Sequence, residues 1–478
     1  MSSSVNPSTE ESVARPTPGP AGVRPIWDGQ KETLPPPEDG PSPEVLGPSR
    51  VRWTSDRAFG PSGNPKRIVG LDVARGFALL GMIAVHILPA YSPYTGRPTV
   101  VWQLLAGNAA ALFALLAGIS VALITGANNP HQGRRMTRSR VSLVTRAILI
   151  LLLGLAISEL PLRVFNILPY YGLMFLVAVL LTGMRIRSLL ITAGGFIVLG
   201  PLAIFALNSF VDYKGPANPN FTSLFTQPVE TLLTLLAGGT YPVITWMAYI
   251  CVGMALGRMN LRWLLTEARL ILWGLVLIAI GSITSWFLID YLGGFEALYY
   301  YTDGYDAEDI IDTIDYGPSK HLPTDTLWWL AIDGPHTNTP FSLVKSLGFA
   351  VLFLGLTLVI SQALRHVLFP LIAAGSMTLT IYVTHLVSFA YFTDSIKAYR
   401  TEWFLGQVIF FLIFASFWHL AFGQGPLERI ISKTCKGVSK RLVPKNAPVS
   451  EDRSTAAPAA AGENTHTPTD AEQSDPRE

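Results

Sequence analysis

The sequence predicts an all-α polytopic membrane protein with about ten transmembrane helices and cytoplasmic N and C termini. Three observations support this fold class. Only 14% of the 478 residues are charged, whereas an average soluble domain carries roughly 25%. Apolar stretches long enough to cross a hydrocarbon core about 30 Å thick recur between Ile68 and Phe422. Arginines gather in alternate connections between these stretches. Together these features exclude an ordinary soluble enzyme.

The chain divides into four parts by composition. Residues 1–66 hold 13 of the 35 prolines and lack apolar periodicity, so we expect a disordered, Pro-rich cytoplasmic arm. No apolar segment with a cleavage site precedes the first span, which is expected to act as an uncleaved anchor. The transmembrane domain covers 67–425, with its largest outer loop at 293–340. A basic cytoplasmic helix is expected at 426–446 and a disordered tail at 447–478.

Each apolar stretch is assigned to a membrane span, and the connections set the orientation. The predicted spans are 68–89, 101–125, 143–160, 169–184, 188–207, 241–257, 269–292, 342–361, 368–391 and 403–422. The positive-inside rule places arginine-rich loops in the cytoplasm, so both termini fall inside and the plasma membrane is the expected location. The second and third spans are joined by a connection without acids that carries Arg134, Arg135, Arg138, Arg140 and Arg146.

The net charge and the cysteines exclude further classes of protein. The formal net charge is only +2, so no basic field predicts a nucleic-acid partner. The chain has 2 cysteines, Cys251 in an apolar span and Cys435 in a basic segment. This leaves the long polar loops without disulfide partners and provides no cysteine-based metal site.

Two connections are predicted to lie outside the membrane as sizeable elements. The segment 293–340 holds nine acids and one lysine, together with Trp328 and Trp329. It is either a solvated cap or a lid whose aromatic side chains pack against a sugar or lipid acceptor. The segment 208–240 contains an apolar run at 229–237 that is too short to span a bilayer. We expect that run to form an interfacial helix.

The first span carries ionisable residues on one face. At 100° per residue, Arg75 lies about 20° from His86 around the helix, and Asp72 lies about 40° from His86 on the other side. Charges inside a span are costly and often mark function. The three residues therefore form a functional stripe, or Asp72 and Arg75 pair at i,i+3 to hold the helix end while His86 is an interfacial histidine.

Three histidines are predicted to face one outer vestibule. His86 and His385 lie at equal estimated depths in the first and ninth spans, and His336 immediately precedes the eighth span. Imidazole titrates near neutral pH and suits general-base chemistry. We therefore predict catalytic roles for His86, His385 and His336, although each alone is also compatible with a structural role.

Signatures of other chemistries do not occur in the sequence. There is no HExxH or comparable ligand spacing, so no metal is predicted. A phosphate-binding Gly-x-x-x-x-Gly-Lys-Ser/Thr loop, a Gly-x-Gly-x-x-Gly turn opening a soluble βαβ unit and a Gly-x-Ser-x-Gly elbow are also absent. ATP-driven transport, dinucleotide chemistry and serine hydrolysis therefore lack their usual sequence motifs.

The first span resembles the opening helix of the heparan-α-glucosaminide N-acetyltransferase-like membrane proteins. The resemblance rests on Arg67-x4-Asp72-x2-Arg75-Gly76-x-Ala78-x3-Met82-x3-His86. It extends more loosely to membrane O-acyltransferases of the acyltransferase-3 type. Weaker matches are Leu112-Phe113 through Gly118-Ile-Ser120, Pro335-His336, Tyr382-Val-Thr-His385 and Gly425-Pro-Leu-Glu428, the last of which is similar to the C-terminus of YeiB-like bacterial membrane proteins.

The resemblance implies a transmembrane acyltransferase that takes an acyl group, expected to be acetyl, from cytosolic acetyl-CoA. Its implied acceptor is an extracytoplasmic sugar or glycolipid of the cell envelope. In the animal enzyme the key histidine follows the first span, but here 87–103 contains none and His86 is the nearest. The resemblance therefore leaves open an acyl-histidine intermediate or deprotonation of an acceptor hydroxyl by a histidine.

The residues are also compatible with an acyl-donor site on the cytoplasmic side of the membrane and an acceptor site on the outer side. Acyl-CoA phosphates cannot cross a bilayer, so a cationic site is needed at the cytoplasmic end. Arg75 and the loop arginines supply charge-assisted donors there, and we predict Arg67, Asp72 and Arg75 as the residues that bind the acyl donor. The loop arginines alternatively serve topology alone.

Two other functions remain open on the sequence. A transporter or lipid flippase without acyl-transfer chemistry would also carry intramembrane charges, and a silent scaffold for envelope assembly is a third possibility. The expected partners are membrane lipids, acyl-CoA and the sugar or glycolipid acceptor, and the chain is compatible with a homo-oligomer.

Overall fold

The computed structural model describes residues 68–211 and 214–444 as helices and connecting loops, without strands. Within these residues, seven helices are long and apolar enough to cross a membrane, and two bent helix pairs raise the number to nine. The all-α polytopic membrane class is therefore confirmed. The fourth predicted span, 169–184, forms α6 (Leu168–Leu181), which is apolar but has only 14 residues. The arm at 1–66 and the tail at 447–478 lie outside the described residues.

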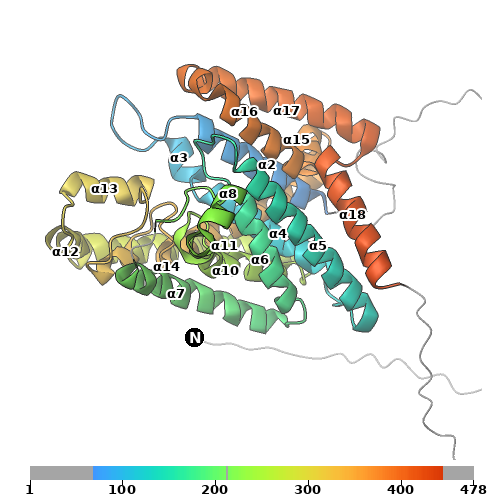
Figure 1. The fold of residues 1–478 in the computed structure, drawn as a ribbon, viewed down its shortest axis with the longest axis horizontal. Coiled ribbons are helices and arrows are strands. Elements are labelled where there is room, and N and C mark those ends of the chain that lie inside the picture. The colour runs from blue at the N-terminus through green and yellow to red at the C-terminus, as the bar shows by residue number, and fades with distance from the viewer. Residues whose placement is uncertain (1–67, 212–213, 445–478) are drawn as a thin grey trace, which may run out of the picture. The chain divides into compact units, whose positions relative to one another are not determined.

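The first half of the described chain supplies the central helix and the bundle around it (Figure 1, blue to green). Its helices are α2 (Val69–Ile87), α3 (Val100–Leu105), α4 (Asn108–Ile124), α5 (Gly133–Ile157), α6, α7 (Ile186–Phe210), α8 (Phe221–Thr226), α9 (Pro228–Leu233), the π-helix η1 (Thr234–Gly238) and α10 (Val243–Leu256).

The second half adds a cap and the remaining long helices (Figure 1, yellow to red). Its elements are α11 (Leu264–Trp286), the π-helix η2 (Phe287–Tyr291), α12 (Gly294–Tyr301), α13 (Ala307–Tyr316), the 3₁₀ helix η3 (Leu327–Ala331), α14 (Pro340–Leu364), α15 (Phe369–Gly375), α16 (Thr378–Ala398), α17 (Arg400–Phe422) and α18 (Pro426–Leu442). The longest packed pair is α11 with α14, while α18 lies along α5.

The central helix α2 contacts α4, α14, α15, α16 and α17. Close approach to α15 depends on two glycines. A Cβ on Gly375 would lie 1.8 Å from the backbone oxygen of Asp72, and a Cβ on Gly76 would lie 2.4 Å from that of Leu371. Small residues let helices pack backbone to backbone in a membrane, where apolar side chains gain little from leaving lipid. The sequence thus brings α15 directly against the charged part of α2.

Two predicted elements differ from the observed ones. The ninth predicted span, 368–391, is not one straight helix, because α15 and α16 meet at 81°. The assumption of a continuous climb from residue 368 to His385 was therefore wrong. The run 229–237, expected as a separate interfacial helix, forms α9 and η1, which meet α10 at 48° and satisfy the criteria for a span jointly with it. In both places the bend occurs at a short break that the apolar pattern does not reveal.

The segment 293–340 folds as a cap with its own small core. Ile289, Leu298, Ile310 and Ile332 surround the fully buried Trp329, whose indole N–H donates to Thr302 Oγ1 at 3.0 Å. This burial gives Trp329 a structural role in the cap rather than a place on an acceptor-binding lid.

We define two ends of the bundle for the description of the site. The cap end contains α12 and α13, and the basic end contains the start of α5 and the end of α18, at opposite sides of Figure 1. Exposed cations on α18 include Lys433, Lys436, Lys440 and Arg441, while Ile431, Cys435 and Ser439 form its buried stripe.

Candidate active site

Two cavities lie along the stripe of α2 that the sequence singles out. The cap-side cavity, about 640 Å³, is lined by His86 and His336 together with residues of the cap. The basic-side cavity, about 610 Å³, is lined by Asp72 and Arg75 with residues of α5, α16 and α18. Met82, one turn before His86, lines both. The charged end and the histidine end of α2 therefore face different chambers that meet at one side chain.

In the basic-side cavity, Arg75 is held by two partners. Its guanidinium donates to Asp72 Oδ1 and to Ser120 Oγ, each at 2.8 Å. Arg146 on α5 lines the same cavity, and no hydrogen bond or ion pair joins its guanidinium to another of the described residues. Glu428 also lines the cavity, but its carboxylate accepts from the backbone N–H groups of Leu379 and Thr380 at the start of α16. Arg146 is therefore the cation most available to a ligand.

The other arginines predicted to bind the acyl donor or set topology have different surroundings. Arg138 donates to the backbone oxygen of Val443, and Arg140 Nε donates to Thr182 Oγ1 at 2.9 Å. These two side chains tie α5 to neighbouring elements. Arg67 lies outside the described residues, so its predicted role has no structural counterpart here.

In the cap-side cavity, His86 contacts His385 across the interface of α2 and α16. His86 Nδ1 lies 3.0 Å from His385 Nε2, and the two rings are nearly parallel, with centroids 5.3 Å apart. His385 is fully buried, and Phe389 packs its edge against both rings. The two histidines predicted to share a site are thus in direct contact, although 298 residues separate them along the chain.

Hydrogen bonds behind His385 set the tautomers of this pair. Ser388 Oγ donates to the backbone oxygen of His385 at 2.7 Å, so it accepts from Gln407 Nε2 at 3.0 Å. Gln407 Oε1 then faces His385 Nδ1 at 2.8 Å and accepts its proton. In a neutral His385 this leaves Nε2 as the acceptor, so His86 Nδ1 is the donor. His86 Nε2 consequently carries the lone pair, and no hydrogen bond to another described residue occupies it.

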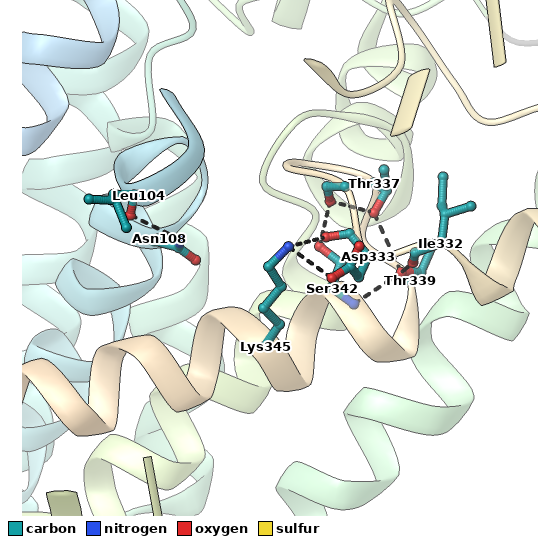
Figure 2. Close-up of polar contacts among 9 residues, drawn as sticks. Leu104, Asn108, Ile332, Asp333, Thr337, Thr339, Ser342 and Lys345 are labelled. Carbon is teal, nitrogen blue, oxygen red and sulfur yellow. Dashed lines mark hydrogen bonds and ion pairs between the residues drawn. The ribbon is translucent and has the colours of Figure 1, made fainter. Parts of the chain in front are cut away.

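His336 reaches the same cavity from a strained loop before α14. His336 and Asn338 both have positive φ, 57° and 56°, and Asn338 Oδ1 accepts from the indole N–H of Trp246 at 2.8 Å. Figure 2 shows the polar contacts that hold the loop, including Lys345 on Asp333 at 2.8 Å. The hydroxyls of Ser342 and Thr337 donate to the backbone oxygen of Gly334, and the hydroxyl of Thr339 donates to the backbone oxygen of Ile332.

The surroundings of His336 make it a neutral group. Burial lowers the pKa of His336 to about 4, and its ring meets that of Tyr241 edge to face, with centroids 5.5 Å apart. His336 Nδ1 is buried without a hydrogen-bond partner among the described residues. The neutral ring of His336 therefore lines the cavity, while its Nδ1 is enclosed by the protein.

His86 and His336 thus line the cap-side cavity, with the buried His385 behind His86, and Asp72 and Arg75 line the other. Sequence reasoning did not identify Gln407 or Ser388. Gln407 is a polar side chain in the middle of the apolar span α17, and such residues are expensive in a membrane unless they bind a partner. That signal alone would have drawn attention to Gln407, but not to its contact with α16.

A metal site is not formed by the described part of the chain. Among residues 68–211 and 214–444, no group of three or more histidine, cysteine, aspartate or glutamate side chains is arranged to hold a metal ion. The three histidines around the cap-side cavity contact each other or aromatic rings instead.

Comparison with known proteins gives a match to one family. Residues 67–289 match the family described as "Heparan-alpha-glucosaminide N-acetyltransferase, catalytic". A comparison with curated proteins gave no match. The matched segment contains Asp72, Arg75, His86 and Arg146, and it ends before His385. This match confirms the resemblance seen in the first span.

Proposed function

We propose that the chain is a transmembrane acyltransferase acting across the plasma membrane, because residues 67–289 match the heparan-α-glucosaminide N-acetyltransferase catalytic family. The acyl group, acetyl by family, would come from acyl-CoA bound at the basic end. The acceptor would be a sugar or glycolipid of the cell envelope bound at the cap end. The positive-inside rule supports placing the basic end in the cytoplasm.

The observation that carries this proposal is the histidine pair at the cap-side cavity. His86 Nε2 has its lone pair free because Nδ1 donates to His385, and this atom can accept the proton of an acceptor hydroxyl. As the hydroxyl oxygen attacks the thioester carbonyl, a C–O bond forms and the C–S bond breaks. The proton then passes from His86 to the departing CoA thiolate. His385 stabilises the charged His86 through the shared hydrogen bond, as orienting groups do in other catalytic sites.

The acyl donor would lie along α2 between the two cavities. From Arg75 to His86 the helix rises about 16 Å, and Met82 stands on this path in both linings. An extended pantetheine arm has a length of this order. Arg146, with Arg75 beside it, would contact the polar part of the donor at the basic end. An acyl group on His86 Nε2 is the alternative to direct transfer, since the same lone pair serves as a nucleophile.

Acyl transfer by the purified protein tests the proposal. The protein in nanodiscs is incubated with acyl-labelled acetyl-CoA and an envelope lipid extract, and single-turnover transfer is compared for wild type, His86→Ala, His385→Ala and His336→Ala. We expect His86→Ala to lower the rate by about 10²- to 10⁴-fold with acyl-CoA binding retained. His366→Ala, at the basic end, is the matched control. Near-normal transfer in all three cavity variants would instead favour transport across the two chambers.

A further inference from the structure

The cap-side cavity has an unbalanced charge. Arg163, Lys214 and Lys320 line it, each from a different connection between helices, and its lining contains no aspartate or glutamate. Within residues 68–211 and 214–444, none of the three cations forms an ion pair. Three like charges around one cavity repel each other, and this arrangement is relieved by an anion that binds between them.

Another part of the lining of the same cavity is apolar and belongs to a candidate membrane helix. Pro201, Ile204 and Phe205 of α7 line it. Helix α7 is one of the seven candidate spans, and only 22% of its most apolar window is buried inside the protein. The rest of this helix therefore faces hydrocarbon, and the cavity borders directly on a lipid-facing element. A ligand that fills both parts has a charged group and an apolar chain.

On the premise of the proposed acyl transfer, we propose that the acceptor is an anionic amphiphile: a lipid whose headgroup carries a phosphate and the hydroxyl that receives the acyl group. The phosphate binds among Arg163, Lys214 and Lys320, and the chain lies against Ile204 and Phe205. The headgroup hydroxyl then faces His86. In the reaction the acceptor O–H and the acyl thioester become an acyl ester and the CoA thiol, so no further reactant is needed.

Four matched acceptors separate the contributions of charge and chain. They are glucose, glucose 1-phosphate, decyl glucoside and glucose linked to decanol through a phosphodiester, each assayed with labelled acetyl-CoA on the protein in nanodiscs. We expect the phosphodiester-linked amphiphile to have the lowest KM. Removal of either the phosphate or the decyl chain should raise KM by about 10-fold or more, since each good ionic or apolar contact contributes on this scale.

The triple variant R163Q/K214Q/K320Q tests the cations directly. It should raise the KM of the phosphodiester-linked amphiphile to that of decyl glucoside, while leaving decyl glucoside transfer and acyl-CoA binding unchanged. The control K397Q/R400Q neutralises two exposed cations that do not line the cavity and should keep the preference.

Two results would overturn the inference while leaving acyl transfer standing. One is an equal KM for glucose and the phosphodiester-linked amphiphile, and the other is a triple variant that keeps the preference for phosphate. Label in none of the four acceptors, and in none of the lipids of an envelope extract, would overturn the proposed function together with this inference.

Discussion

In the basic-side cavity the cations lie beside carboxylates, whereas in the cap-side cavity they lie beside none. Asp72 and Ser120 hold Arg75, and Glu428 lines the same chamber. The cap-side cavity instead combines the neutral His336 with three cations that form no ion pair with another described residue. In the first chamber the protein itself supplies partners for Arg75, whereas in the second the inference above assigns the counter-charge to a ligand.

This contrast changes which arginine should matter for acyl-CoA. The sequence singled out Arg75 because it lies on the stripe of α2. In the structure two of its five N–H donors are used by Asp72 and Ser120, so its loss would also remove an ion pair from Asp72. Arg146 forms no hydrogen bond or ion pair with another of the described residues. Under the proposed function, Arg146 rather than Arg75 is therefore the cation of the basic-side cavity that would contact the acyl donor.

The largest expected effect concerns the orientation of the two cavities, that is, which of them faces the cytoplasm. In a background with Cys251 and Cys435 replaced by alanine and serine, we introduce Asp303→Cys at the cap end or Asn128→Cys at the basic end, both exposed positions. On intact cells an impermeant maleimide should label the first completely and the second not at all. After permeabilisation both should react. The reverse pattern would place the histidines on the cytoplasmic side and contradict the proposed direction of transfer.

The hydrogen-bond chain behind His86 provides the next largest effect. Gln407→Leu removes the acceptor of the His385 Nδ1 proton, so the tautomers of both histidines are no longer fixed. We expect kcat to fall about 10- to 100-fold, less than for loss of the base itself, with acyl-CoA affinity unchanged. Gln407→Glu keeps an acceptor and should restore kcat.

A positioning role for Gln407 also predicts a change in the pH profile. A carboxylate at position 407 stabilises the charged histidine pair, so the acidic limb of kcat should move to higher pH in Gln407→Glu. Gln103→Leu, at an exposed position on α3, is the control. Equal loss of activity in Gln407→Leu and Gln407→Glu, with an unmoved limb in the latter, would reduce Gln407 to a packing residue.

The sequence predicts the parts of this site that depend on local helix geometry better than those that depend on contacts between residues far apart along the chain. The stripe of α2 follows from helix geometry alone; in the structure Asp72 and Arg75 line one cavity and His86 lines the other. The pairing of His86 with His385 was predicted from an assumed depth in a straight ninth span. The contact exists although that span bends at 81°, so the reasoning behind it was wrong in this respect.

The parts that escaped sequence reasoning depend on contacts between distant helices. Gln407 reaches His385 from α17, and Glu428 reaches the start of α16 from α18. Neither contact has a local pattern, because each joins elements whose crossing angle is set by tertiary packing. Trp329 shows the converse, since its aromatic ring suggested acceptor binding but lies in the core of the cap.

The acyl-donor side of the comparison is tested by Arg146→Ala. Loss of its guanidinium should weaken acetyl-CoA binding about 10-fold, the effect of one charge-assisted contact, as measured by calorimetry on the protein in nanodiscs. Arg140→Ala, on the same helix but bonded to Thr182, should bind acetyl-CoA normally. For Arg75, replacement by lysine should preserve part of the affinity because charge remains but the planar fork is lost. Unaltered binding by Arg146→Ala would remove this residue from the donor site.

The smallest effect concerns His336 and pH. Its pKa is about 4 in the folded protein, against about 6.5 in an unfolded chain. Between these values the unfolded chain binds more protons, so folding stability falls as pH drops from about 6.5 toward 4. His336→Asn, which suits the positive φ at this position, removes this contribution. The Tm of wild type should therefore fall more steeply than that of the variant from pH 6.5 to 4.5, by about 2 °C or more.

The same pKa fixes what His336 can do in catalysis. Above pH 5 it is already neutral, so it cannot account for an acidic limb of the rate profile above that pH. His336→Asn should accordingly keep the position of that limb. His366→Asn serves as the control for Tm and rate. A shift of the acidic limb in His336→Asn would show that His336, rather than His86, exchanges the proton. His336 would then be the general base at the cap-side cavity.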